Sequence, residues 1–170
     1  MLTVQEANKH AKITSNLFLS NWGGSKDKTQ LVENKIKNII CINEETTKTS
    51  FDMKMYEEMY IKHHYVKASD HRSANLDLPN LTKLMEECLR EGPLLVHCSM
   101  GQSRSPTAIL AYLLKVTYAS PETPFDMRKK LLPTLIKFVQ KRRPYTDPNI
   151  GFLQQLRSYE DNLKSQKNGS

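Results

Sequence analysis

Cysteine is scarce in this 170-residue sequence, which has only Cys41, Cys88 and Cys98. So few thiols, and an odd number of them, do not make the framework of a secreted disulfide-rich domain. We therefore expect a reducing setting, the cytoplasm and also the nucleus. Long apolar runs are missing too, because the longest, Ala108 to Val116, is interrupted by Lys115 and a membrane-spanning helix needs about 20 apolar residues. Residues 1–12 also lack the apolar core of a secretory signal, so we expect no membrane insertion.

The remaining composition is that of an ordinary globular domain, with 38% hydrophobic and 25% charged residues. This excludes a collagen-like or wholly disordered chain, and the length suits one domain. The 25 Lys and Arg outnumber the 18 Asp and Glu, which gives a formal net charge of +7. An excess of this size favours an acidic ligand. It is spread along the chain rather than concentrated in one stripe, so nucleic acid is a disfavoured partner.

Strand-like and helix-like segments alternate along the chain. Strands are predicted at Ile13–Leu19 (in a hairpin), Ile36–Ile42, Tyr60–Val66 and Leu94–Val96. Helices are predicted at Ser25–Lys35 (capped by Ser25), Leu78–Leu89, Pro106–Val116, Leu135–Val139 and Phe152–Leu163 (capped by Asn149). Residues 46–58 fit neither period. This alternation predicts a single α/β domain with a mostly parallel central sheet flanked by helices.

The segment from His97 to Pro106 carries the chemistry, because it is a polar loop between a predicted strand and a predicted helix. Such a loop directs backbone N–H groups and a helix N-terminus at one point, which makes an anion site. Cys98 at its entrance is placed as a nucleophile, since that environment favours the thiolate. Arg104 supplies the planar fork that pairs with phosphate oxygens. Gly101 lets the backbone bend without Cβ strain.

The pattern His97-Cys98, five residues, Arg104-Ser105 resembles the signature of the cysteine-dependent protein phosphatases. Gly101 followed by Ser103-Arg104-Ser105 resembles, more narrowly, the atypical dual-specificity branch. The likeness extends over most of the chain, from Ile13 to Tyr159, and includes Leu17–Asn21, Ile36–Asn43, Arg142–Pro144, Pro148–Asn149 and Gly151–Phe152. It implies hydrolysis of phosphotyrosine and phosphoserine or phosphothreonine in protein substrates through a cysteinyl-phosphate, with no metal and no cofactor.

The resemblance also implies a role for each residue of the loop. Cys98 is the nucleophile, Arg104 holds the phosphate, and Ser105 stabilises the departing thiolate. His97 orients the loop from beneath and helps to favour the thiolate. The implied phosphate-binding positions are Ser99, Met100, Gly101, Gln102, Ser103 and Arg104.

A general acid is implied on a loop upstream of Cys98, where two carboxylates are available. Asp70 follows a predicted strand and can reach the rim of the pocket from a loop, so we favour it. Asp77 adjoins the start of a predicted helix, where a carboxylate also has a structural role at the helix dipole. Asp77 stays an alternative.

The expected organisation is an N-terminal extension at 1–12, a catalytic domain at 13–163 and a flexible C-terminal tail at 164–170. The connection at residues 118–133 looks longer than is usual in the family. It is a surface insertion, a lid or a surface that binds a partner. Three other activities remain open: an RNA 5′-triphosphatase, a phosphoinositide phosphatase and a phosphate-binding pseudophosphatase scaffold. Neutral Ser99, Met100 and Gln102 count against the lipid reading, and the intact nucleophile counts against the scaffold. The oligomeric state is not predicted.

Several other residues have ordinary structural explanations beside functional ones. Cys41 and Cys88 are expected in the core, although Cys41 could also form a disulfide with an oxidised Cys98. His63 and His64 are adjacent on a predicted strand and point to opposite faces, so they do not share a metal site. Arg142 and Arg143 could either contact phosphate at the pocket edge or stabilise a helix C-terminus.

Overall fold

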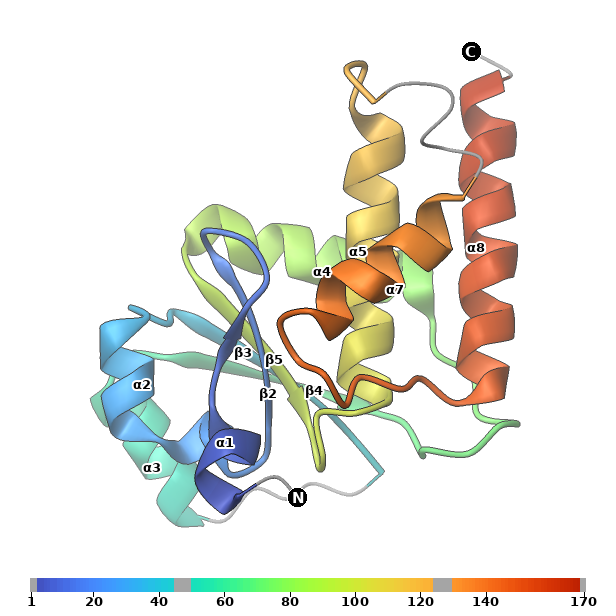
Figure 1. Ribbon diagram of the computed structural model, residues 1–170. Coiled ribbons are helices and arrows are strands. Elements are labelled where there is room, and N and C mark those ends of the chain that lie inside the picture. The colour runs from blue at the N-terminus through green and yellow to red at the C-terminus, as the bar shows by residue number, and fades with distance from the viewer. Residues whose placement is uncertain (1–2, 45–49, 124–129, 169–170) are drawn as a thin grey trace.

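A five-stranded sheet runs through the computed structural model, which describes residues 3–44, 50–123 and 130–168 (Figure 1). The strands are β1 (Ala11–Lys12), β2 (Leu17–Asn21), β3 (Asn38–Asn43), β4 (Lys62–Lys67) and β5 (Leu94–Cys98). They lie in the order β1-β2-β5-β3-β4, and every neighbouring pair is parallel except the β1–β2 hairpin. The predicted α/β fold with a mostly parallel central sheet is confirmed.

Four helices pack on one face of this sheet and form the larger core with it (Figure 1). They are α4 (Leu78–Glu91), α5 (Arg104–Ala119), α7 (Leu131–Gln140) and α8 (Ile150–Asn168). Helix α5 is buried along most of its length and contacts the other three. Its position directly after β5 places the helix N-terminus at the carboxyl end of the sheet. None of the helices in the described residues is long and apolar enough to cross a membrane.

The opposite face of the sheet carries a smaller core under α2 (Lys28–Glu33) and α3 (Ser50–Glu58). Ile39 and Leu95 from the strands pack there with Leu31 and Tyr56 from the helices. Side chains alternate between faces along a strand, so Ile40 and Val96 belong to the larger core instead. The ambiguous stretch of the sequence is therefore helical from Ser50, and its residues 46–49 lie outside the described chain.

Several predicted helix ends differ from the structure. The helix predicted at Ser25–Lys35 is α2, and Asp27 caps it by accepting the N–H of Gln30. Ser25 is not the cap. It lies in a 3₁₀ turn over Gly24–Lys26, where its hydroxyl donates to the carbonyl of Trp22. Helix α7 begins at Leu131 with Pro133 in its first turn, where proline costs no intrahelical hydrogen bond. Helix α8 continues beyond Leu163 to Asn168, through part of the expected tail. In the 118–133 stretch, residues 124–129 lie outside the described chain.

The segment before Ile13 forms α1 (Val4–Asn8) and β1. Thr3 and Glu6 make a capping box at the start of α1. The ring of His10 is buried with its Nε2 2.8 Å from the carbonyl oxygen of Gly24, and Ala11 joins the larger core. Within the expected extension, the structure thus buries His10 and Ala11 and pairs β1 with β2, whereas α1 has no buried residue.

Candidate active site

Hydrogen bonds from other segments to its carbonyl oxygens hold the loop between β5 and α5 in place. Four consecutive carbonyls, from residue 99 to residue 102, accept hydrogen bonds from other parts of the chain. The donors, in that order, are the N–H of Trp22 (3.1 Å), Nη2 of Arg143 (3.2 Å), Nε of Arg143 (2.7 Å) and the N–H of Asp147 (2.8 Å). Carbonyls that face outward turn amides of the loop inward, over the N-terminus of α5. The result is a cradle for an anion.

Gly101 is required at the bend of this loop. Its φ is +64°, in the left-handed region that side chains rarely adopt. A Cβ there would lie 2.5 Å from the carbonyl oxygen of Ser20 and would also collide with Arg143. The prediction that glycine is needed for the bend is supported by both the backbone and the neighbours.

Cys98 lies at the base of the cradle, and its side chain is almost fully buried. Its Sγ receives two hydrogen bonds of 3.2 Å, from the N–H of Gly101 and from the hydroxyl of Ser105. Donors to sulfur stabilise the thiolate relative to the thiol. Burial in the core raises the pKa of the Cys88 thiol, on α4, to about 11. The structure therefore brings Cys98 and Ser105 together as the sequence predicted.

Arg104 is buried beside the loop, and two of its three guanidinium nitrogens donate to neighbours. Its Nη1 donates to the carbonyl of Ala68 and its Nη2 to the hydroxyl of Ser99, both at 3.2 Å. Its Nε is buried, and no residue in the described part of the chain accepts from it. A buried donor without a partner costs about 1–3 kcal/mol. An anion in the cradle would accept from this edge of the guanidinium.

Asp70 is the carboxylate that the structure brings to the loop. Its Oδ1 accepts the hydroxyl of Ser103 at 2.7 Å and Nδ2 of Asn149 at 2.9 Å, and the residue is exposed. Asp77 instead caps α4, where it accepts the N–H of Asn80 at 3.2 Å and the amide Nδ2 of Asn80 at 2.7 Å. Of the two candidates that the sequence left open, only Asp70 contacts the cradle.

The whole arrangement matches a known family. The family model described as "Dual specificity phosphatase, catalytic domain" matches residues 17–162. The chain belongs to the dual specificity phosphatase family. It is 33% identical over 153 residues to human dual specificity protein phosphatase 21, covering 90% of this chain and 73% of the relative. It is 31% identical over 154 residues to rat dual specificity protein phosphatase 18, covering 90% and 68%.

A solved structure of the family has the same architecture. The crystal structure of DUSP15 superposes with a TM-score of 0.73 at 27% sequence identity, covering 95% of this chain and 96% of the other. The domain that defines this family is a phosphatase catalytic domain, which acts on phosphorylated substrates. The resemblance drawn from the sequence is confirmed.

Asn43 supports the phosphatase loop although the sequence did not single it out. Its Oδ1 accepts both the N–H and the hydroxyl of Ser99, each at 2.9 Å. The amide of Ser99 is thus directed to the end of β3 rather than into the cradle. This differs from the expectation that every amide from Ser99 to Arg104 would bind phosphate. The signal available in the sequence was a polar residue at the carboxyl end of a strand next to β5.

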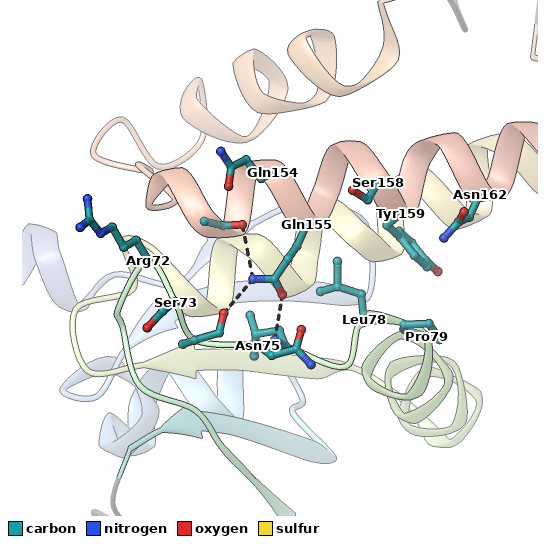
Figure 2. A pocket seen from close by; sticks show the side chains of 13 residues that line it. Arg72, Ser73, Asn75, Leu78, Pro79, Gln154, Gln155, Ser158, Tyr159 and Asn162 are labelled. Atoms are coloured by element: carbon teal, nitrogen blue, oxygen red, sulfur yellow. Dashed lines mark hydrogen bonds between the residues drawn. The ribbon is translucent and has the colours of Figure 1, made fainter.

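Helix α8 anchors the segment that carries Asp70 (Figure 2). Gln155 donates from Nε2 to the carbonyl of Ala74 at 2.8 Å and accepts the N–H of Leu76 at 2.9 Å. At Gly151 the backbone of this segment passes so close that any Cβ would collide with the carbonyl oxygen of Arg72. A cavity of about 400 Å³ remains between the segment and α8. Asn149 caps α8 as predicted.

His97 lies on the sheet face opposite Cys98. Its Nδ1 is 3.4 Å from the carbonyl oxygen of Cys98, and burial lowers the pKa of the ring to about 3, so the ring is neutral at pH 7. Its contact with Cys98 is therefore a hydrogen bond from a neutral ring to the backbone carbonyl. Cys41 is the register partner of His97 and shares its face. The sheet thus separates the thiols of Cys41 and Cys98, which argues against a disulfide between them.

Arg143 lies beneath the loop rather than at the pocket edge. Besides its two bonds to the loop it donates to the carbonyls of Lys9 at 3.3 Å and Ala7 at 3.1 Å, and only 2% of its surface is exposed. It therefore links the N-terminal segment that contains α1 to the cradle. The sequence had suggested only a phosphate contact or a stabilised helix C-terminus for this residue. Arg142 does stabilise a helix end, with Nη1 3.1 Å from the carbonyl of Phe138.

We expect Arg143→Ala to destabilise the protein by about 2–4 kcal/mol, because the carbonyls of Lys9, Met100 and Gly101 lose the donor that Arg143 gives them. Turnover should fall as well, since two of those carbonyls belong to the loop. Arg142→Ala is the matched control, because that side chain is exposed. Urea unfolding of both variants measures the difference. Equal unfolding free energies for the two variants would contradict this role of Arg143.

Proposed function

We propose that this protein is a phosphatase that hydrolyses phosphotyrosine and phosphoserine or phosphothreonine in protein substrates. The observation that carries the proposal is the position of Cys98, whose sulfur accepts two hydrogen bonds. It lies at the base of the loop whose carbonyls are hydrogen-bonded to other segments. Arg104 beside it keeps a buried donor for an anion. The proposed catalytic unit is residues 13–163, braced by α1 and β1.

The first step transfers the phosphoryl group to sulfur. The thiolate of Cys98 attacks phosphorus while Arg104 and the inward amides hold the equatorial oxygens. The bond between phosphorus and the leaving oxygen breaks, and Asp70 gives its proton to that oxygen. The hydrogen bonds from Ser103 and Asn149 hold the Asp70 carboxyl at the rim for this transfer.

The second step releases inorganic phosphate. Water attacks phosphorus, and the Asp70 carboxylate formed in the first step accepts a proton from it. The bond between phosphorus and sulfur breaks, and the sulfur leaves as a thiolate. The hydroxyl of Ser105, 3.2 Å from Sγ, stabilises that charge. His97 acts as a positioning residue beneath the loop.

The surroundings of the loop favour protein substrates. Met100 is 67% exposed at the rim, and the loop positions around it are uncharged. These uncharged positions supply no extra cations for the several phosphates of a polyphosphorylated lipid, which favours a phosphate monoester on a protein. The chemistry also needs a reduced Cys98, which suits a reducing compartment, the cytoplasm or nucleus.

We expect Asp70→Asn to lower kcat on a phosphotyrosine peptide by about 10²–10³-fold, because the leaving oxygen and the attacking water both lose their proton partner. Asp77→Asn is the control, since asparagine caps helices as well as aspartate does. The kcat of both variants on that peptide is the measurement. A loss confined to Asp77→Asn would show that the acid is assigned to the wrong residue.

A further inference from the structure

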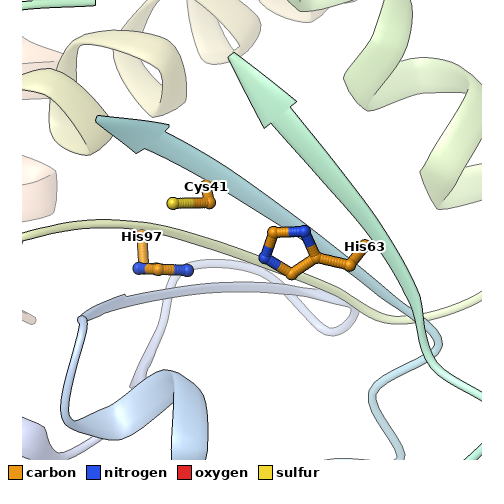
Figure 3. A group of neighbouring side chains, drawn as sticks. All are labelled: Cys41, His63 and His97. Carbon is orange, nitrogen blue, oxygen red and sulfur yellow. The ribbon is translucent and has the colours of Figure 1, made fainter. Parts of the chain in front are cut away.

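Cys41, His63 and His97 form a cluster on the sheet face opposite the catalytic thiol (Figure 3). They come from β3, β4 and β5, three neighbouring strands. Cys41 is in register with His97, and His63 is in register with Ile39, so all three side chains project from the face that α2 and α3 cover. His64 points to the other face, as the sequence predicted.

The spacing of the cluster is close to that of a metal site. One ligand atom from each residue lies within 4.8 Å of the other two. Metal–nitrogen and metal–sulfur bonds of about 2.0–2.3 Å put the ligands of a tetrahedral zinc ion roughly 3.5 Å apart. Rotations of the side chains that bring the atoms closer by at most about 1.3 Å would complete the site.

His97 has the hydrogen bonding of a metal ligand. Its Nδ1 is 3.4 Å from the carbonyl oxygen of Cys98, which fixes the proton on that nitrogen. The other nitrogen, Nε2, is buried and has no hydrogen-bond partner among residues 3–44, 50–123 and 130–168. Histidines that bind metal in proteins characteristically donate their second N–H to a backbone carbonyl or carboxylate in this way.

The ring of His63 is held by a neighbouring ring and is partly exposed to solvent. The ring of Tyr56 stacks on it, with 5.2 Å between the centroids and 19° between the planes. His63 is half-buried, whereas Cys41 and His97 are almost fully buried. The stacked tyrosine limits the ring to few orientations, and the partly exposed edge gives an ion a path from solvent.

We propose that Cys41, His63 and His97 bind one zinc ion per chain. One thiolate and two imidazoles are a donor set that zinc prefers, with a fourth position for water. Cys41 binds as the thiolate, and its proton leaves to solvent when the ion enters. The site lies on the face away from the cradle, so the proposal does not depend on the proposed phosphatase reaction.

The test is a titration of the full-length Cys98→Ser protein with Co²⁺, a spectroscopic substitute for zinc. Replacing Cys98 removes the catalytic thiol as a competing ligand. We expect one Co²⁺ per chain, a thiolate-to-cobalt charge-transfer band, and loss of that band when Zn²⁺ is added. Adding Cys41→Ser should abolish the band, and adding His63→Gln should weaken binding on the order of 100-fold.

Cys88→Ser in the same background is the matched control and should keep the band, because Cys88 lies on α4 in the other core. Circular dichroism and thermal unfolding without metal report whether each variant folds. His63→Gln decides the question if Cys41→Ser does not fold. No band in the Cys98→Ser protein, or a band unchanged by His63→Gln, would overturn the proposal.

Discussion

Cys98→Ser is expected to lower turnover of an aryl phosphate by at least about 10⁴-fold, as loss of the nucleophile does in other enzymes with covalent intermediates. A serine hydroxyl is a weak nucleophile without an adjacent base, and the neighbours of residue 98 are donors rather than acceptors. The N–H of Gly101 and the hydroxyl of Ser105 both point at the sulfur. These donors stabilise a thiolate and give a serine no help in losing its proton.

Cys88→Ser is the control for this result. Cys88 is a buried thiol on α4, and its raised pKa of about 11 keeps it neutral. The steady-state rates of the two variants and of the unaltered protein, on the same aryl phosphate, are the measurement. A Cys98→Ser protein that is folded and retains one hundredth of the activity would show that another residue is the nucleophile.

Arg104→Lys is expected to lower kcat/KM by about 10²–10³-fold although it keeps the positive charge, a loss of the size seen when one preorganised transition-state donor is removed. The guanidinium spans the site, with Nη1 on the carbonyl of Ala68, Nη2 on the hydroxyl of Ser99 and Nε left for an anion. An ammonium is a point charge and cannot make these bonds together with a bidentate contact to phosphate.

Arg142→Lys separates this effect from a general loss of charge. Arg142 lies at the end of α7, over the ring of Phe138 at 3.7 Å, and its side chain is exposed. We expect its kcat/KM on the same phosphotyrosine peptide to stay within a factor of two or so. If the two lysine variants lost activity equally, the arginine fork would not be what holds the phosphate.

Apart from Asp70, which the family resemblance implied, the parts of the site that could be predicted from the sequence are close together in the chain. Cys98, Gly101, Arg104 and Ser105 are within eight consecutive positions, and the strand before them and the helix after them have clear hydrophobic patterns. Local geometry therefore determines how these residues face one another. The choice of a parallel sheet followed from the same alternation of strand and helix.

The supports of the loop could not be predicted, because they come from distant segments. Arg143 is 42 positions from its partner Gly101 and Asn43 is 56 positions from Ser99, and the sequence around them has ordinary helix-end and strand patterns. The link from Asp70 to Asn149 joins residues 79 positions apart. Competing short-range roles also hid some details, as at Ser25, where the hydroxyl closes a turn instead of capping α2.

The central claim is that phosphate passes through a covalent bond to Cys98, and a mass measurement tests it most directly. Asp70→Asn protein mixed with an aryl phosphate whose leaving group needs no acid should complete the first step but hydrolyse the intermediate slowly. Rapid denaturation and mass spectrometry should then find one phosphoryl group per chain, on the peptide that contains Cys98. A phosphoryl group on any other residue, or steady turnover with no phosphorylated chain at any time, would contradict the account.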